Sequence, residues 1–121
     1  MKKILLFNMN IFKQNQLRTM CNKLGIEVVS ISKNLYNQKL GFLADISGFK
    51  KEPKTYTGAE LPSEMLVFSG LNSDDIDTFL AEFKKAGIAP VNLKAVITMY
   101  NISWTPKSLY DELLKEHLSM K

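Results

Sequence analysis

Three residue types that build reactive sites are almost absent from this sequence of 121 residues. It has one cysteine, Cys21, one histidine, His117, and one arginine, Arg18. A single cysteine cannot form an internal disulfide, and one cysteine with one histidine cannot supply the N and S ligands of a zinc site. Recognition of phosphates and bases favours the arginine fork. The sequence therefore argues against a zinc protein and against a dedicated nucleic-acid reader.

Long apolar runs and glycine-rich motifs are also missing. The first apolar run, Ile4–Phe7, ends at Asn8, and no stretch approaches the ~18 apolar residues of a membrane span. Neither a G-x-G-x-x-G pattern nor a P-loop occurs. We therefore expect a cytoplasmic protein with no membrane partner, and we predict no cofactor.

Length and composition predict a single domain spanning residues 1–121, because 45% hydrophobic residues can form a core at this size. The charge is distributed unevenly. Residues 1–54 carry ten basic and three acidic side chains, a net charge of +7, whereas residues 55–121 carry six basic and nine acidic, a net charge of −3. Such asymmetry can support self-association, so a homodimer is possible, although a lysine-rich solvated surface also explains it.

The same order of elements is predicted twice. Short apolar or β-branched runs predict strands, and apolar residues spaced i, i+3, i+4, i+7 predict helices. The predicted strands are 3–8, 26–32, 64–70 and 92–100, and the predicted helices are 16–25, 37–46, 72–87 and 106–120. The halves also share short sequences, "ILLF" with "MLVF" and "NKLGI" with "KKAGI". We interpret the chain as an internal pseudo-repeat.

The fold class follows from this order. The strands at 3–8 and 64–70 are apolar at consecutive positions, so both faces of the sheet must be covered. Alternating strands and helices are typical of a parallel sheet. We predict an α/β fold with a small four-stranded sheet in a βαβα-βαβα pseudo-repeat and helices covering the sheet. The alternative is a ferredoxin-like α+β fold with an extra C-terminal helix.

Residues 47–62 are the one long irregular segment. Its aromatic residues alternate with the lysines of the Lys50–Lys54 arm, a pattern that superficially resembles a basic–aromatic nucleic-acid contact. The interpretation that we favour is an arm folded over the sheet or over a neighbouring subunit, with its lysines in water. Nucleic acid is therefore an unlikely partner.

No catalytic constellation is visible. His117 lies near the end of the last predicted helix, and Cys21 lies on an apolar helical stripe, where a packed thiol is expected. Asp74, Asp75 and Asp77 stand at a predicted helix start, where the helix dipole favours acidic residues without any metal. We predict no catalytic residue and no metal ligand, and we lean against an enzyme.

Polar residues follow three of the predicted strands. In an open parallel sheet, ligands bind at the carboxyl ends of the strands. A small-molecule site at this edge would be lined by Asn8, Ser69, Thr98, Asn101 and Trp104. The same residue types also serve as caps and turn residues, and we favour that structural interpretation.

The segment "TMYNISWTPKSL" contains the one tryptophan of the chain. Thr105 suits a helix N-cap and Pro106 suits the first helical position, which predicts a helix start there. Thr98, Asn101 and Trp104 are not explained by this helix start. We expect Trp104 to be buried between the last helix and the sheet, and the alternative is that it lines an open cleft with Asn101.

The segments "KILLFN", "LGFLADISGF", "EMLVFSGL", "LKAVITMYNISW" and "LYDELLKEH" resemble, in this order, a bacterial family called domain of unknown function 3783. The most specific part of the resemblance comprises Leu93–Thr98, Asn101, Trp104, Glu112 and Glu116. Tyr100 departs from the family, in which a small or polar residue is usual. The resemblance implies a small, bacterial, cytoplasmic protein. It carries no established activity, so no catalytic or binding residue can be transferred.

Three functional hypotheses remain. The first is a non-enzymatic binding, regulatory or protein-interaction module that self-associates. The second is a small-molecule-binding protein or an enzyme, with its site near Asn101 and Trp104. The third is a nucleic-acid-associated protein that uses the Lys50–Lys54 arm.

Overall fold

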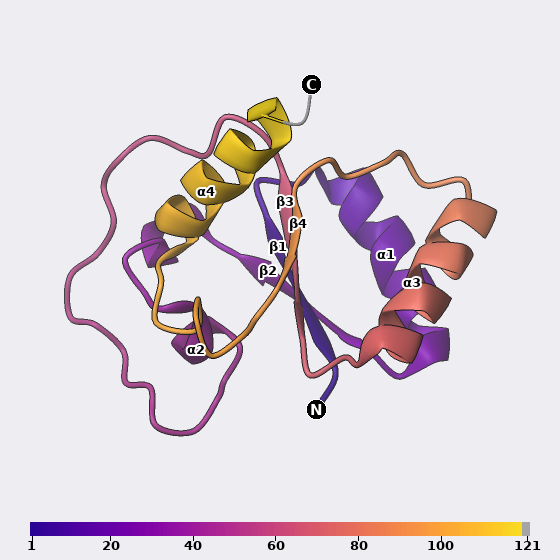
Figure 1. Ribbon diagram of the computed structural model, residues 1–121, viewed down its shortest axis with the longest axis horizontal. Helices are drawn as coiled ribbons and strands as arrows, with labels where there is room; N and C mark the ends of the chain where they lie inside the picture. Colours follow the sequence, from indigo (N-terminus) through magenta and orange to yellow (C-terminus); the bar gives the residue numbers. More distant parts are fainter. Residues whose placement is uncertain (120–121) are drawn as a thin grey trace.

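Both halves of the chain contribute strands to one four-stranded sheet in the computed structural model, which describes residues 1–119 (Figure 1). The strands are β1 (Lys3–Phe7), β2 (Glu27–Ile31), β3 (Met65–Ser69) and β4 (Lys94–Val96). The helices are α1 (Ile11–Leu24), α2 (Leu40–Leu43), α3 (Ser73–Lys85) and α4 (Pro106–Ser119), with a 3-10 turn, η1, at Lys33–Leu35. The predicted α/β class is confirmed, and the predicted helix end at Met120 lies outside the described residues.

The sheet is mixed, with the order β2-β1-β3-β4. The pairs β1–β2 and β3–β4 are parallel, but β1 and β3 are antiparallel, with Phe7 opposite Met65 and Lys3 opposite Ser69. The predicted fully parallel arrangement is therefore wrong. The two strands of each strand–helix–strand unit, β1-α1-β2 and β3-α3-β4, are parallel to each other. The long segment between β2 and β3 allows the second unit to run antiparallel to the first. The ferredoxin-like alternative, a split βαβ arrangement, differs too, because β1 and β2 are direct neighbours.

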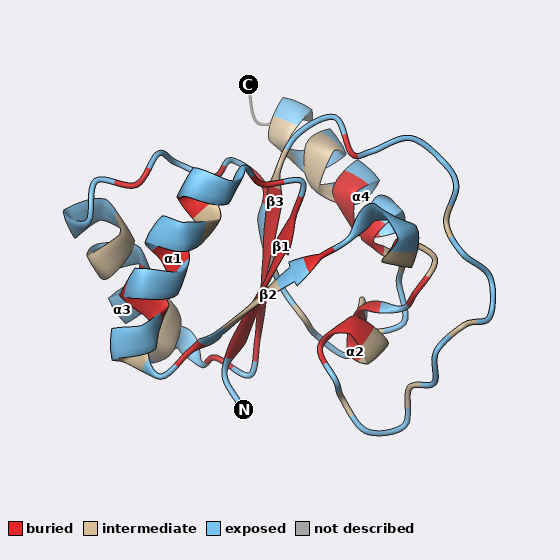
Figure 2. Ribbon diagram, turned by 180° about the vertical axis from the view of Figure 1, so that it is seen from behind, coloured by how far each residue is buried: buried red, intermediate tan, exposed pale blue. Residues whose placement is uncertain are grey.

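Helices α1 and α3 lie on one side of the sheet, while α2, α4 and the long loop lie on the other (Figure 1). Side chains of the central strands alternate between the two sides. One core contains Ile4, Leu6, Leu66 and Phe68 with residues of α1 and α3, and the other contains Leu5, Phe7, Met65 and Val67 with residues of α2 and α4. Every position of β1 and β3 is buried (Figure 2). The prediction that both faces are covered is therefore confirmed.

The sequences shared by the two halves encode the same helix ending. After α1 and after α3 a glycine adopts the left-handed conformation, with φ of 69° and 70°, which is easy for a residue without Cβ. The next backbone amide then donates to a carbonyl five residues earlier, from Ile26 to Cys21 at 3.1 Å and from Ile88 to Phe83 at 3.4 Å. The repeated "LGI" and "AGI" segments therefore end equivalent helices before the chain returns to the sheet.

An asparagine is the N-cap residue of both α1 and α3. The Asn10 side chain accepts from the Lys13 amide at 2.9 Å, so α1 starts at Ile11, five residues before the predicted start. Asn72, the first residue of the predicted helical segment 72–87, forms a capping box with Asp75, and α3 itself starts at Ser73. An ion pair with Lys2 at 2.9 Å and the Asn72 amide lower the pKa of Asp75 below its usual value.

The predicted helix over residues 37–46 is mostly wrong, because α2 covers only Leu40–Leu43. The helix ends when Asp45 adopts a left-handed φ of 59° and the Ile46 amide donates to the Gly41 carbonyl at 2.8 Å. This closure satisfies the terminal carbonyls but stops the helix after about one turn.

The segment 47–62 is folded against the α2 side of the protein, and its two aromatic rings have partners there. The Tyr56 ring lies 5.5 Å from the Tyr36 ring, and the Tyr56 hydroxyl donates to the Ala59 carbonyl at 2.8 Å. Phe49 covers Gly41, where a Cβ atom would lie 2.6 Å from the Phe49 ring. These rings are therefore not displayed for base stacking, which supports the interpretation of a folded arm.

Candidate functional site

The mixed sheet separates the residues of the predicted small-molecule site. Asn8 follows β1 at one end of the sheet, and its side chain donates to the Leu61 carbonyl at 2.7 Å. Ser69, Thr98 and Asn101 end or follow β3 and β4, which run in the opposite direction. Ser69 is buried within the sheet. A single crevice lined by all the predicted residues does not form, because it required a fully parallel sheet.

Thr98 and Asn101 build a tight turn at the end of β4. The Asn101 side chain accepts from the Thr98 amide at 2.9 Å and donates to the Val96 carbonyl at 3.0 Å. The Thr98 hydroxyl accepts from the Tyr100 amide at 3.2 Å. These contacts end the strand at Val96, so the prediction that it continues to Tyr100 is wrong. The Asn101 amide is therefore engaged on both of its ends by local backbone.

Residues of the same turn and just after it accept hydrogen bonds from the first residues of α2. The amides of Leu40 and Gly41 donate to the carbonyls of Trp104 and Ile102, at 2.8 and 2.9 Å. These amides belong to the first turn of α2 and have no partner within that helix. Two of the segments that carry the family resemblance, "LGFLADISGF" and "YNISW", are therefore joined through backbone hydrogen bonds.

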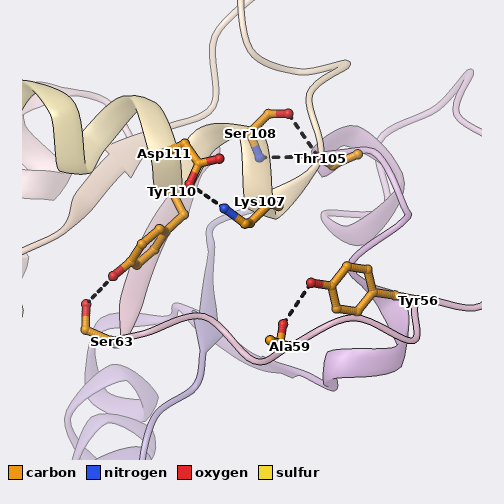
Figure 3. A network of polar contacts seen from close by, with 8 residues as sticks. All are labelled: Tyr56, Ala59, Ser63, Thr105, Lys107, Ser108, Tyr110 and Asp111. Carbon is orange, nitrogen blue, oxygen red and sulfur yellow. Dashed lines mark hydrogen bonds and ion pairs between the residues drawn. The ribbon is translucent and has the colours of Figure 1, made fainter.

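The helix α4 begins where the sequence predicts. The Thr105 hydroxyl accepts from the Ser108 amide at 3.3 Å, and Pro106 is the first helical residue (Figure 3). Lys107, the second residue of the helix, forms an ion pair at 2.6 Å with Asp111, which lies one turn further along. The Tyr110 hydroxyl shares a hydrogen bond of 2.9 Å with Ser63, which attaches the helix to the end of the long loop (Figure 3).

Trp104 is 37% exposed, so the prediction that it is buried between the last helix and the sheet is wrong. It belongs to a group of large apolar side chains that are exposed on β4 and the turn after it. We call this group the β4-turn surface, and it comprises Val96, Met99, Tyr100 and Trp104. Met99 is 82% exposed and Tyr100 is 81% exposed. Sequence reasoning missed Met99 and Tyr100, although the chain from Ala95 to Pro106 contains no charged residue, which was the available signal.

The two side chains with potential reactivity, Cys21 and His117, are both removed from solvent to some degree. Cys21 is fully buried in the core between α1, α3 and the sheet, and His117 is half-buried on α4. Within residues 1–119, no group of three or more His, Cys, Asp or Glu side chains is arranged to hold a metal ion. No helix in the same range has the length and apolar character needed to cross a bilayer.

Burial raises the pKa of the Cys21 thiol to about 12, because the thiolate would lose its hydration in the apolar core. We therefore expect iodoacetamide at pH 8 to alkylate the native protein at least about a hundredfold more slowly than the protein unfolded in guanidinium, since the thiolate is the reacting form. Mass spectrometry of timed samples measures both rates. Rapid labelling of the native protein would show that Cys21 is accessible and contradict its role as a packed core residue.

The fold and these surfaces define a small α/β protein with an open sheet. Residues 64–120, which include β3, α3, β4 and the described part of α4, match the family described as domain of unknown function DUF3783. The resemblance predicted from the sequence is confirmed over this segment, and residues 1–63 lie outside it. Comparisons with curated proteins and with solved structures found no match.

Proposed function

We propose that this protein is a non-enzymatic interaction module that self-associates through the β4-turn surface. The observation that carries the proposal is the exposure of Met99 and Tyr100, at 82% and 81%, on a turn that is fixed by its own hydrogen bonds. Large exposed apolar patches mark interaction sites, and Met99 and Tyr100 are adjacent in the chain. The bacterial origin and cytoplasmic location implied by the family resemblance belong to the same proposal.

A second copy of the chain suits this surface for an electrostatic reason. In a two-fold symmetric contact the same patch meets itself, so an unpaired charge close to the symmetry axis would face its own copy. The chain from Ala95 to Pro106 carries no charge, and Lys107, which follows it, is paired with Asp111. Two copies can therefore bring Met99 and Tyr100 together without charge repulsion from this segment.

The double substitution Met99→Ser/Tyr100→Ser should weaken self-association at least about tenfold, because it removes most of the exposed apolar area of the turn. Its effect on the free energy of unfolding should stay small, since both side chains are solvated in the monomer. Sedimentation velocity at concentrations from about 5 to 500 μM measures the association of both proteins.

Phe12→Ser is the matched control, because Phe12 is also 81% exposed but lies at the start of α1, outside the β4-turn surface. It should leave self-association unchanged. A wild-type protein that remains monomeric throughout the concentration range would contradict the proposed function. An equal effect of the two variants would show that the association depends on general hydrophobicity and not on this surface.

The two other functional hypotheses have less support. A ligand beside Asn101 and Trp104 would have to compete with the hydrogen bonds that Asn101 makes to Thr98 and Val96. A nucleic acid on the Lys50–Lys54 arm would meet exposed lysines but not the faces of Phe49 and Tyr56, which have packing partners within the protein.

A further inference from the structure

A polar cavity of about 300 Å³ lies where the parallel strands β1 and β2 end. This is the position at which open α/β sheets commonly bind ligands. The walls come from the end of β1 with the β1–α1 connection, from α1, from the end of β2 with the residues after it, and from the long loop before β3. The polar residues among them are Asn8, Gln14, Ser30, Ser32, Lys33 and Glu60. Four chain segments therefore contribute polar groups to one cavity.

Glu60 is an acceptor whose position is fixed. Its Oε1 atom accepts from the Tyr36 hydroxyl at 2.5 Å and from the Leu61 amide at 2.9 Å. Tyr36 is itself 1% exposed and lies against Phe7, with 5.9 Å between the ring centroids. The carboxylate is therefore attached to the core on one side, while its Oε2 atom has no partner among the described residues and is free for a ligand.

Asn8 is a second fixed acceptor. It has a left-handed φ of 51°, and its Nδ2 atom donates to the Leu61 carbonyl at 2.7 Å. That bond leaves the amide oxygen available. Glu60 is next to Leu61 in the chain, so Asn8 and Glu60 are attached to the same short stretch of the loop. Two acceptors on a fixed backbone form a suitable environment for an ammonium group.

The opposite charge is supplied by Lys33, which begins η1 directly after β2. Lys33 takes part in none of the ion pairs found within residues 1–119. The neighbouring Ser32 adds a hydroxyl donor. By contrast, the Gln14 amide is already engaged, since it donates to the Met9 carbonyl at 2.6 Å and accepts from Ser30 at 2.6 Å.

We propose that this cavity binds a small polar α-amino acid. The ammonium group of the ligand is bound by Glu60 and Asn8, and its carboxylate is bound by Lys33 and Ser32. A single cation and a single anion that do not pair with each other match the two charges of a zwitterion, whereas an anion or a cation alone would use only one of them. The predominantly polar walls suit a short polar side chain. The site is separate from the β4-turn surface, so this inference does not depend on self-association.

Isothermal titration calorimetry of the wild-type protein with L-serine, L-asparagine and L-glutamine tests this proposal. Each is compared with its N-acetyl derivative, which lacks the ammonium group, and with its amide, which lacks the carboxylate. We expect at least one free amino acid to bind, and both derivatives of that amino acid to bind at least about tenfold more weakly, since each loses a charge-assisted hydrogen bond. Failure of all three free amino acids to bind at millimolar concentration would overturn the proposal, as would equal binding of a derivative.

Two conservative variants locate the binding. Glu60→Gln keeps an acceptor for Tyr36 but removes the charge, and Lys33→Gln removes the cation. Each should weaken binding at least about tenfold. Lys50→Gln and Glu112→Gln make the same changes at exposed positions outside the cavity and should bind as the wild type does. Circular dichroism verifies folding of each variant. Unchanged binding by folded Glu60→Gln and Lys33→Gln would place the ligand elsewhere and refute this site.

Discussion

Glu64→Ala is expected to lower the free energy of unfolding by about 3 kcal/mol, because it leaves the buried ammonium of Lys13 without its counter-charge. The Lys13 side chain is 8% exposed and forms an ion pair with Glu64, which is 23% exposed. Its ammonium also donates to the Pro90 carbonyl at 3.1 Å. One lysine on α1 therefore connects the residue before β3 with the loop that leads to β4. Urea unfolding monitored by circular dichroism measures the loss.

A double-mutant cycle separates the pair from its surroundings. Lys13→Met and Glu64→Leu, combined, should cost less than the sum of the two single changes, because no unpaired charge remains in the interior. The surface pair of Lys107 and Asp111 is the control, and Asp111→Ala should lower the free energy of unfolding clearly less than Glu64→Ala does, since water screens both groups. A loss below about 1 kcal/mol for Glu64→Ala would mean that the Lys13 ammonium reaches water.

The elements were predictable from the sequence where local interactions determine them. The starts of α4 and α3 lie close to the predicted ones, because side chains that bond to the backbone within one turn determine them: Thr105 before α4 and Asn72 before α3. The burial of β1 and β3 follows from their unbroken apolar runs. Each of these predictions depends on residues that are close in the chain.

The direction of β3 was not predictable in the same way. The strand–helix–strand order within each half predicts that its two strands are parallel to each other. Nothing in the 47–62 segment determines whether β3 runs parallel or antiparallel to β1. The predicted ligand site inherited this error, because it assumed that Asn8 and Asn101 lie at the same edge. In the mixed sheet they follow strands of opposite direction.

The cavity at the end of β1 and β2 illustrates the same limit on a smaller scale. Asn8 was predicted as a site residue because it follows a strand. Lys33 and Glu60 were not, because they come from different segments and share a location only after the chain has folded. The exposure of Met99 is likewise a tertiary property, since an apolar residue near a strand end is equally compatible with a buried position.

Phe79→Ala is expected to cost about 3–5 kcal/mol of unfolding free energy, the range for removing a large buried aromatic side chain. Phe79 is 1% exposed on α3 and meets Phe68 of β3 edge to face, with ring centroids 5.1 Å apart. The rigid sheet cannot collapse into the space that the ring leaves, so a cavity remains next to β3. Urea unfolding measures this loss.

Phe83→Ala provides the comparison for that prediction, because Phe83 stacks on Phe79 at 5.9 Å but is only half-buried. Its substitution should lower the free energy of unfolding clearly less, since solvent already reaches part of its ring.

The Phe79→Ala variant also tests whether self-association depends on the stability of the fold. The β4-turn surface is hydrogen-bonded to α2 on the opposite face of the sheet, so folded Phe79→Ala should self-associate as the wild type does. A Phe79→Ala protein that loses less than about 1 kcal/mol would show that α3 does not form the tight core contact described, and that the α1–α3 side of the sheet is loosely packed.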